Sequence, residues 1–67
     1  MLTQQLVTAL TRERQRQGLT QKTVAERMGA HPNFVQIIEY NKREPKISTL
    51  ERYAAALGVT ITVGIER

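Results

Sequence analysis

The stretch that decides the fold is "TQKTVAERMGAHPNFVQIIEY", Thr20–Tyr40. Its apolar residues form two groups with the three- and four-residue spacing of amphipathic helices, and a glycine separates the groups. The first group comprises Val24, Ala25 and Met28, and the second comprises Val35 and Ile38. Thr20 is a good N-cap for the first helix. Pro32 suits the start of the second, because its missing N–H would be unpaired there anyway. The stretch therefore predicts two short helices, over about residues 21–28 and 32–40.

Two further helices are predicted outside this stretch. Leu6 and Leu10 lie four residues apart and predict a first helix over about residues 3–17. The segment "STLE", Ser48–Glu51, has the pattern of a capping box and predicts the start of a fourth helix. A glycine follows three of these helical segments, where a residue with a left-handed backbone commonly ends a helix. These glycines are Gly18, Gly29 and Gly58. The predicted fold class is all-α, with four helices.

After the last of these glycines the pattern changes to strict alternation. Every second residue is apolar, which predicts a short C-terminal β-strand. A lone strand leaves its backbone N–H and C=O groups unpaired, so its simplest partner is the same strand of a second copy, antiparallel about a two-fold axis. The alternative is a tail whose first residues pack on the core. We therefore predict a domain over residues 1–59 and a dimerisation strand over residues 60–67. The apolar face of this strand carries Ile61, Val63 and Ile65.

The composition limits the classes of function. With 67 residues the chain is one small domain, and ten Lys and Arg against six Glu give a net charge of +4 that suits a polyanionic partner. There is no Cys, and His31 is the only His, so we expect no enzyme, no metal site and no cofactor. No apolar run approaches the roughly 18 residues that span a bilayer, and the N-terminus lacks a signal-peptide pattern. We therefore expect a cytoplasmic protein without membrane contact.

The two helices around Gly29 would form a helix-turn-helix unit. The wider sequence "RQRQGLTQKTVAERMGAHPNFVQIIEYNKREPKISTLERYAAALGV" resembles the Xre/Cro/C1-type helix-turn-helix repressors, over about residues 6–59. The residues that carry this resemblance are Arg14, Gly18, Leu19, Thr20, Gln21, Val24, Ala25, Gly29, Val35, Ile38, Glu39, Pro45, Ala54, Leu57 and Gly58. Asn41 stands where the family commonly has Gly, and both residues tolerate a left-handed backbone.

This resemblance implies a lambda-repressor-like four-helix domain that binds double-stranded DNA. The implied function is that of a transcriptional regulator, in most cases a repressor that binds a pseudo-palindromic operator as a homodimer. The predicted C-terminal strand replaces the fifth helix of the phage repressors and is similar to the end of HipB-type antitoxins. The alternative function is therefore an antitoxin-type module that binds a partner toxin as well as its own operator.

By this resemblance, the predicted helix over residues 32–40 is the recognition helix, which enters the major groove. The predicted base-reading residues are Pro32, Asn33, Gln36 and Ile37. Asn33 is the best of them, because an amide can bond an adenine at N6 and N7, although a capping role near the helix start is the alternative. Pro32 can make only van der Waals contact. Phe34 has equal claims to a half-buried place and to contact with a thymine methyl group. An A·T-containing half-site is expected.

Other residues are expected to contact phosphates or to hold the fold. The predicted phosphate contacts are Thr20, Gln21, Lys22, Tyr40, Asn41, Lys42 and Arg43, with an ordinary solvated loop as the alternative for the last two. In the family, the positions of Arg14 and Glu39 form a partly buried ion pair. This pair would tie the first helix to the end of the recognition helix. Arg12 and Arg16 share one face of the first helix by their four-residue spacing, and both are expected to be solvated.

Overall fold

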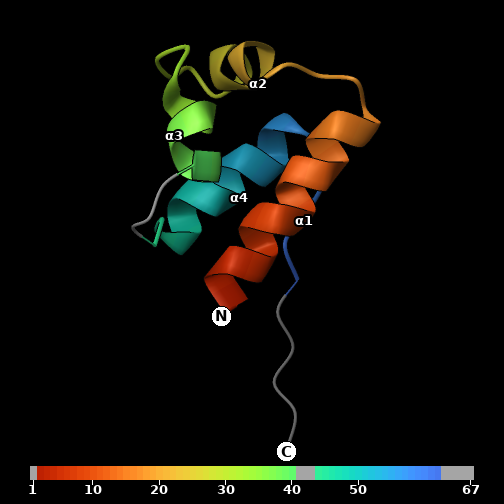
Figure 1. Cartoon of the computed structure of the whole chain (residues 1–67), viewed down its shortest axis with the longest axis vertical. Helices are drawn as coiled ribbons and strands as arrows, with labels where there is room; N and C mark the ends of the chain where they lie inside the picture. Colours follow the sequence, from red (N-terminus) through yellow and green to blue (C-terminus); the bar gives the residue numbers. More distant parts are fainter. Residues whose placement is uncertain (1, 41–43, 63–67) are drawn as a thin grey trace, which may run out of the picture.

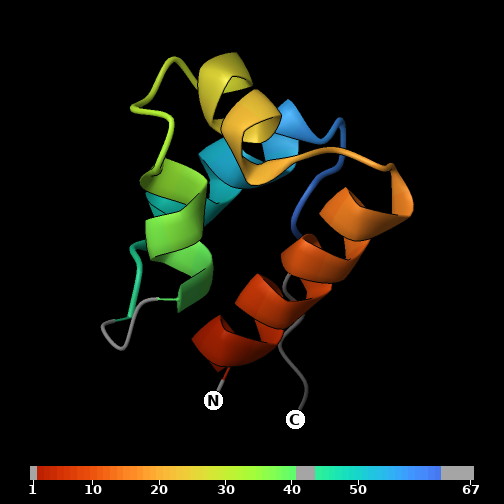
Figure 2. The same ribbon diagram turned by 45° about the horizontal axis from the view of Figure 1, so that its top comes forward.

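A computed structural model describes residues 2–40 and 44–62 of the chain. The described residues form four α-helices: α1 (Leu2–Arg16), α2 (Gln21–Arg27), α3 (Phe34–Tyr40) and α4 (Ile47–Ala56). The short helices α2 and α3 pack on each other, and both α1 and α2 pack on α4 (Figure 1). Helix α1 also contacts α3, and Figure 2 shows these two helices beside each other from a second direction. The predicted all-helical, four-helix fold is confirmed for these residues.

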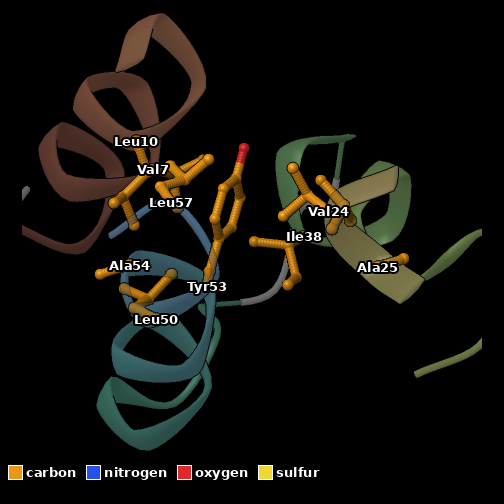
Figure 3. Packing of buried hydrophobic residues seen from close by; sticks show 10 residues of the cluster. Val7, Leu10, Val24, Ala25, Ile38, Leu50, Tyr53, Ala54 and Leu57 are labelled. Atoms are coloured by element: carbon orange, nitrogen blue, oxygen red, sulfur yellow. The ribbon is translucent and has the colours of Figure 1, made fainter. Parts of the chain in front are cut away.

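One hydrophobic core joins all four helices. Its buried members are Val7, Leu10, Val24, Ala25, Val35, Ile38, Leu50, Tyr53, Ala54 and Leu57. The ring of Tyr53 lies in the middle of this cluster, between side chains of α1 and side chains of α2 and α3, with its oxygen at the edge (Figure 3). Burying a side chain such as Val or Leu contributes about 1.5–3 kcal/mol, so these residues supply most of the favourable free energy of folding.

Gly29 shows why glycine is needed in the turn between α2 and α3. Its φ angle is +68°, in the left-handed region that residues with a Cβ atom adopt at a cost of about 1–2 kcal/mol. A Cβ atom at this position would meet nothing within 4 Å, so the requirement is conformational and not a matter of space. The φ angles of Gly18 and Gly58 are +71° and +75°, and the predicted glycine caps are therefore confirmed.

Two predicted helix starts are wrong. Helix α3 begins at Phe34 and not at Pro32, because the Phe34 N–H closes a tight turn onto the His31 carbonyl at 2.8 Å. Helix α4 begins at Ile47, one residue before the predicted capping box. The carbonyl of Lys46 accepts the N–H of Leu50 at 3.1 Å, so Lys46 is the N-cap, and its own side chain makes no capping hydrogen bond.

The C-terminal segment does not form a strand in the part that the structure describes, residues 59–62. Val59 and Ile61 pack against the core of their own chain, over α1 and α4. This agrees with the alternative that the first residues of the segment pack on the core. Val63 and Ile65, which were predicted to share the strand face with Ile61, lie outside the described residues. Among the described helices, none combines the length and the apolar character that crossing a membrane requires.

Candidate nucleic-acid interface

Helix α3 has one buried face and one exposed face. Val35 and Ile38 are 0% and 3% exposed, so they fix the helix on the core. Gln36 is exposed. Ile37 is 54% exposed, although isoleucine side chains are usually buried in globular proteins. The structure thus places the two predicted base-reading residues of this helix together on its outer face. An exposed amide beside an exposed apolar side chain can offer both hydrogen bonds and methyl contact to a ligand.

The other two predicted base readers, Pro32 and Asn33, lie in the turn just before α3, and both are exposed. The Asn33 N–H donates to His31 Nδ1 at 3.2 Å, and the Asn33 carbonyl accepts the N–H of Ile37 at 3.0 Å. These two bonds hold the backbone of Asn33 at the start of the helix. Its exposed amide therefore projects from a fixed point. The position of Asn33 suits both a cap on α3 and contact with a base.

Phe34 differs from its exposed neighbours. Its side chain is half-buried and packs against the hydrophobic core. Of the two alternatives that the sequence left open for Phe34, the structure shows the half-buried one. Ile37 is then the large apolar side chain that the outer face of α3 presents.

The predicted phosphate-contact residues differ in their surroundings. Thr20 caps α2: its hydroxyl accepts the Thr23 N–H at 3.0 Å and donates to the Thr23 hydroxyl at 2.9 Å. The Thr20 hydroxyl proton is thus already used within the fold. Lys22 is exposed and Tyr40 is 84% exposed, so both side chains are accessible. Gln21 is partly buried and bonds Glu39. The remaining predicted contacts, Asn41, Lys42 and Arg43, lie outside the described residues.

Glu39, near the end of α3, is the centre of a hydrogen-bond network that joins all four helices. Arg14 of α1 donates to it twice, from Nε at 2.8 Å and from Nη2 at 3.1 Å. Gln21, the first residue of α2, donates from Nε2 at 2.9 Å. The hydroxyl of Tyr53 in α4 also donates to Glu39. The side chains of Arg14 and Glu39 are only 11% and 8% exposed, so this is a largely buried ion pair.

The network keeps Glu39 ionised. Burial alone would raise the pKa of its carboxyl group, but the donors on Arg14, Tyr53 and Gln21 bond the ionised form and bring the pKa below its ordinary value. Burial and the adjacent Glu39 carboxylate raise the pKa of Tyr53, so the phenol keeps its proton at neutral pH. The hydrogen bond to Glu39 raises the pKa of Arg14. The site therefore holds one negative and one positive charge, with the carboxylate fully bonded.

Two members of this network, Gln21 and Tyr53, were not predicted to bond Glu39. Gln21 was expected only as a phosphate contact, and no polar partner was predicted for Tyr53. A signal for Tyr53 does exist: a buried tyrosine usually needs a partner for its hydroxyl, and in this structure the partner is Glu39. Gln21 has no such signal, because water can bond the amide of a glutamine at the start of a helix.

Comparison with known proteins places the chain in a family. A profile of the family described as Helix-turn-helix matches residues 10–63, most of the chain, and the chain therefore belongs to this family. The resemblance to Xre/Cro/C1-type proteins is thereby confirmed. The family is one of DNA-binding domains, which agrees with the expectation that the chain is not an enzyme.

Antitoxin HigA1 of Mycobacterium tuberculosis is a relative of this chain, in the strains CDC 1551 / Oshkosh and ATCC 25618 / H37Rv. It is 41% identical over 61 residues in both strains. The match covers 91% of this chain but only 41% of the length of each relative. The chain thus corresponds to less than half of these antitoxins. No solved structure gives a significant match.

Proposed function

We propose that this chain is the DNA-binding domain of a transcriptional regulator, which binds a pseudo-palindromic operator as a homodimer and acts as a repressor. The single observation that supports this most is the outer face of α3, where Gln36 and Ile37 stand exposed on a helix whose other face is locked into the core. In the helix-turn-helix family, to which the chain belongs, the second helix of the motif enters the major groove.

Within this proposal, α3 and the turn just before it read base edges. Asn33 bonds an adenine at N6 and N7 through its amide, and Gln36 supplies a second amide one turn further on. Ile37 and Pro32 contact apolar groups, including the C5 methyl of thymine. The exposure of all four residues supports these roles.

The residues proposed to contact DNA phosphates lie on both sides of these base-reading residues. Gln21 and Lys22 lie at the start of α2, and Tyr40 lies at the end of α3, so phosphates on either side of the groove would meet them. The Gln21 amide keeps one N–H for a phosphate while the other is bonded to Glu39. The proposal retains Asn41, Lys42 and Arg43 as phosphate contacts after α3. For Thr20 it retains only the backbone N–H, since the hydroxyl proton is engaged.

We also propose that the C-terminal segment pairs two chains. In this proposal residues 60–67 form the dimer element beside the DNA-binding domain of residues 1–59, with Ile61, Val63 and Ile65 on its apolar face. Ile61 already packs on the core, so the decisive variant removes only residues 63–67 and leaves that packing intact. Sedimentation should show a dimer for the full chain and a monomer for the truncated chain. A truncated chain that is still dimeric would refute this part of the proposal.

The proposed function is tested by selection from random duplexes. We expect enrichment of a two-fold symmetric site whose half-site centres lie about 34–36 Å apart, with A·T pairs in each half. Affinity should fall steeply with salt, because each neutralised phosphate lowers the slope of log K against log salt by about 0.9. An excess of single-stranded or folded RNA should not displace the duplex. Absence of any enriched duplex would refute the proposal.

A second candidate function is that of an antitoxin, favoured by the 41% identity to antitoxin HigA1. In this case the chain binds a toxin protein in addition to its operator. The test is co-expression with the product of the neighbouring gene. An antitoxin should form a purifiable complex with that product and relieve the growth arrest that it causes alone. If the neighbouring product neither arrests growth nor binds the chain, the regulator function stands alone.

A further inference from the structure

We propose that a groove between α1 and the end of α3 binds the phosphodiester backbone of the same duplex, with Arg12 of α1 as its cationic contact. The proposed function confines DNA contact to α2, α3, the residues just before each of these helices, and residues 41–43. This inference rests on that function and extends the interface onto α1, where Arg12 was expected to be solvated and not bound to DNA.

The groove has a volume of about 480 Å³ and opens beside the proposed interface. Its α1 wall includes Thr8, Thr11, Arg12 and Gln15, and its opposite wall includes Gln21 and Tyr40. Gln21 and Tyr40 are both already proposed to contact phosphates. A DNA strand that meets both of them would run along the mouth of this groove and past α1.

The polar atoms of the groove show which side chains could bind a phosphate. The hydroxyl of Thr8 donates to the Gln4 carbonyl at 3.0 Å, and that of Thr11 donates to the Val7 carbonyl at 2.8 Å. Both hydroxyl protons are thus used within α1. Arg12 and Gln15 are exposed, and of these two only Arg12 carries a positive charge.

The charge balance of the groove also favours an anion. Glu39 lines it, but its carboxylate is bonded to Arg14, Gln21 and Tyr53 and is balanced by the Arg14 guanidinium. Arg12 takes part in neither of the two ion pairs found among the described residues. Arg14 and Glu39 neutralise each other, so Arg12 gives the groove one further positive charge.

Arg16 provides a matched control on the same helix. It lies one turn after Arg12, is exposed like Arg12, and has the same charge. It does not line the groove, and its guanidinium is bonded to Glu13, with Nε at 2.9 Å from Oε1. Sequence spacing puts the two arginines on one face of α1, whereas the structure gives them different surroundings.

The test measures affinity of the full chain for its selected operator at several salt concentrations, for the wild type, Arg12→Ala, Arg12→Lys and Arg16→Ala. The slope of log K against log salt is negative. Arg12→Ala should make it shallower by about 0.9 for each chain bound, while Arg16→Ala leaves it unchanged. Arg12→Lys should keep most of the slope, because a lysine also neutralises a phosphate. Melting temperatures of all four proteins should agree, since neither arginine is buried.

Each other outcome overturns the inference. If Arg12→Ala keeps the wild-type slope, or if Arg16→Ala loses as much, α1 does not contact the backbone at this groove, although the proposed function stands. If Arg12→Ala melts below the wild type and Arg12→Lys does not restore the slope, Arg12 acts on the fold and not on DNA. If the wild type itself binds no duplex, the proposed function fails first and the inference fails with it.

Discussion

The two ion pairs of the described residues look alike in composition but differ in kind. Arg16 and Glu13 are three residues apart on α1, with side chains that are 70% and 24% exposed. Arg14 and Glu39 are 25 residues apart, are 11% and 8% exposed, and connect two helices. An exposed pair adds little to stability because water and salt screen it. A buried pair is different, since the removal of one partner strands a charge away from water. Position in the fold, and not the charges themselves, decides what an ion pair contributes.

The largest expected effect is that of Glu39→Ala. It would leave the buried Arg14 guanidinium without its carboxylate and remove the acceptor of Gln21 and Tyr53. Breaking such a pair costs about 3–5 kcal/mol, a large part of the stability of a small domain. Chemical denaturation should show this loss, and DNA binding should fall only in proportion to the unfolded fraction. A variant that stays as stable as the wild type yet loses its operator would contradict this account of Glu39.

A smaller effect is expected for Tyr53→Phe, which removes one hydroxyl and keeps the buried ring. Hydrogen bonds to charged groups contribute about 1.5–3 kcal/mol, so the free energy of unfolding should fall by about that much. The same denaturation experiment measures it. In the double variant Tyr53→Phe/Glu39→Ala the two losses should not add, because the hydroxyl then has no carboxylate to bond. Additive losses would show that the Tyr53 hydroxyl stabilises the fold independently of Glu39.

The two carboxylates should also differ in how pH affects stability. The pKa of Glu39 is lowered by its bonds in the folded state, so its contribution to stability is complete above the ordinary carboxyl value of 4.5 and is lost as pH falls through the lower folded pKa. Glu13, whose pKa is lowered to about 2 by its bonds to Arg16 and Gln17, acts with the same sign. Salt distinguishes them: in high salt the acid-induced loss of melting temperature should persist in Glu13→Gln and be reduced in Glu39→Gln. Equal curves for both variants would refute the distinction.

The smallest expected effect is that of Glu13→Ala. Its partner Arg16 is solvated and can be hydrated without cost, so the melting temperature at neutral pH should change little. Gln17 keeps a second bond, from its amide to the Leu57 carbonyl at 2.8 Å, and continues to join α1 to the end of α4. A destabilisation as large as that of Glu39→Ala would remove the contrast between the two pairs.

The sequence predicted the helical fold well, because the apolar spacing of a small core leaves few other arrangements. The glycine caps followed from the same reasoning. The starts of α3 and α4 were placed wrongly, since Pro32 and Ser48 are good residues for a first turn but a backbone turn at His31 and the carbonyl of Lys46 set the first helical bonds. Such competition between backbone bonds is not visible in residue preferences.

The candidate site was only partly predictable. Helical spacing could identify the outer face of α3, and Ile37 is exposed there. It could not show that Phe34 packs on the core, because that depends on how the helices are arranged in the tertiary fold. Nor could it separate Arg12 from Arg16, since four-residue spacing puts both on one face and only the tertiary fold brings Tyr40 and Gln21 opposite one of them.

We propose that the outer face of α3 and the turn before it read DNA, while Glu39 near the end of α3 holds the fold. The most direct measurement is operator affinity together with melting temperature for Asn33→Ser, because serine caps a helix as well as asparagine but cannot bond an adenine bidentately. We predict a loss of about 1–3 kcal/mol in binding, with relaxed preference for adenine at one position, at an unchanged melting temperature. Wild-type affinity and wild-type base preference in this variant would contradict the claim.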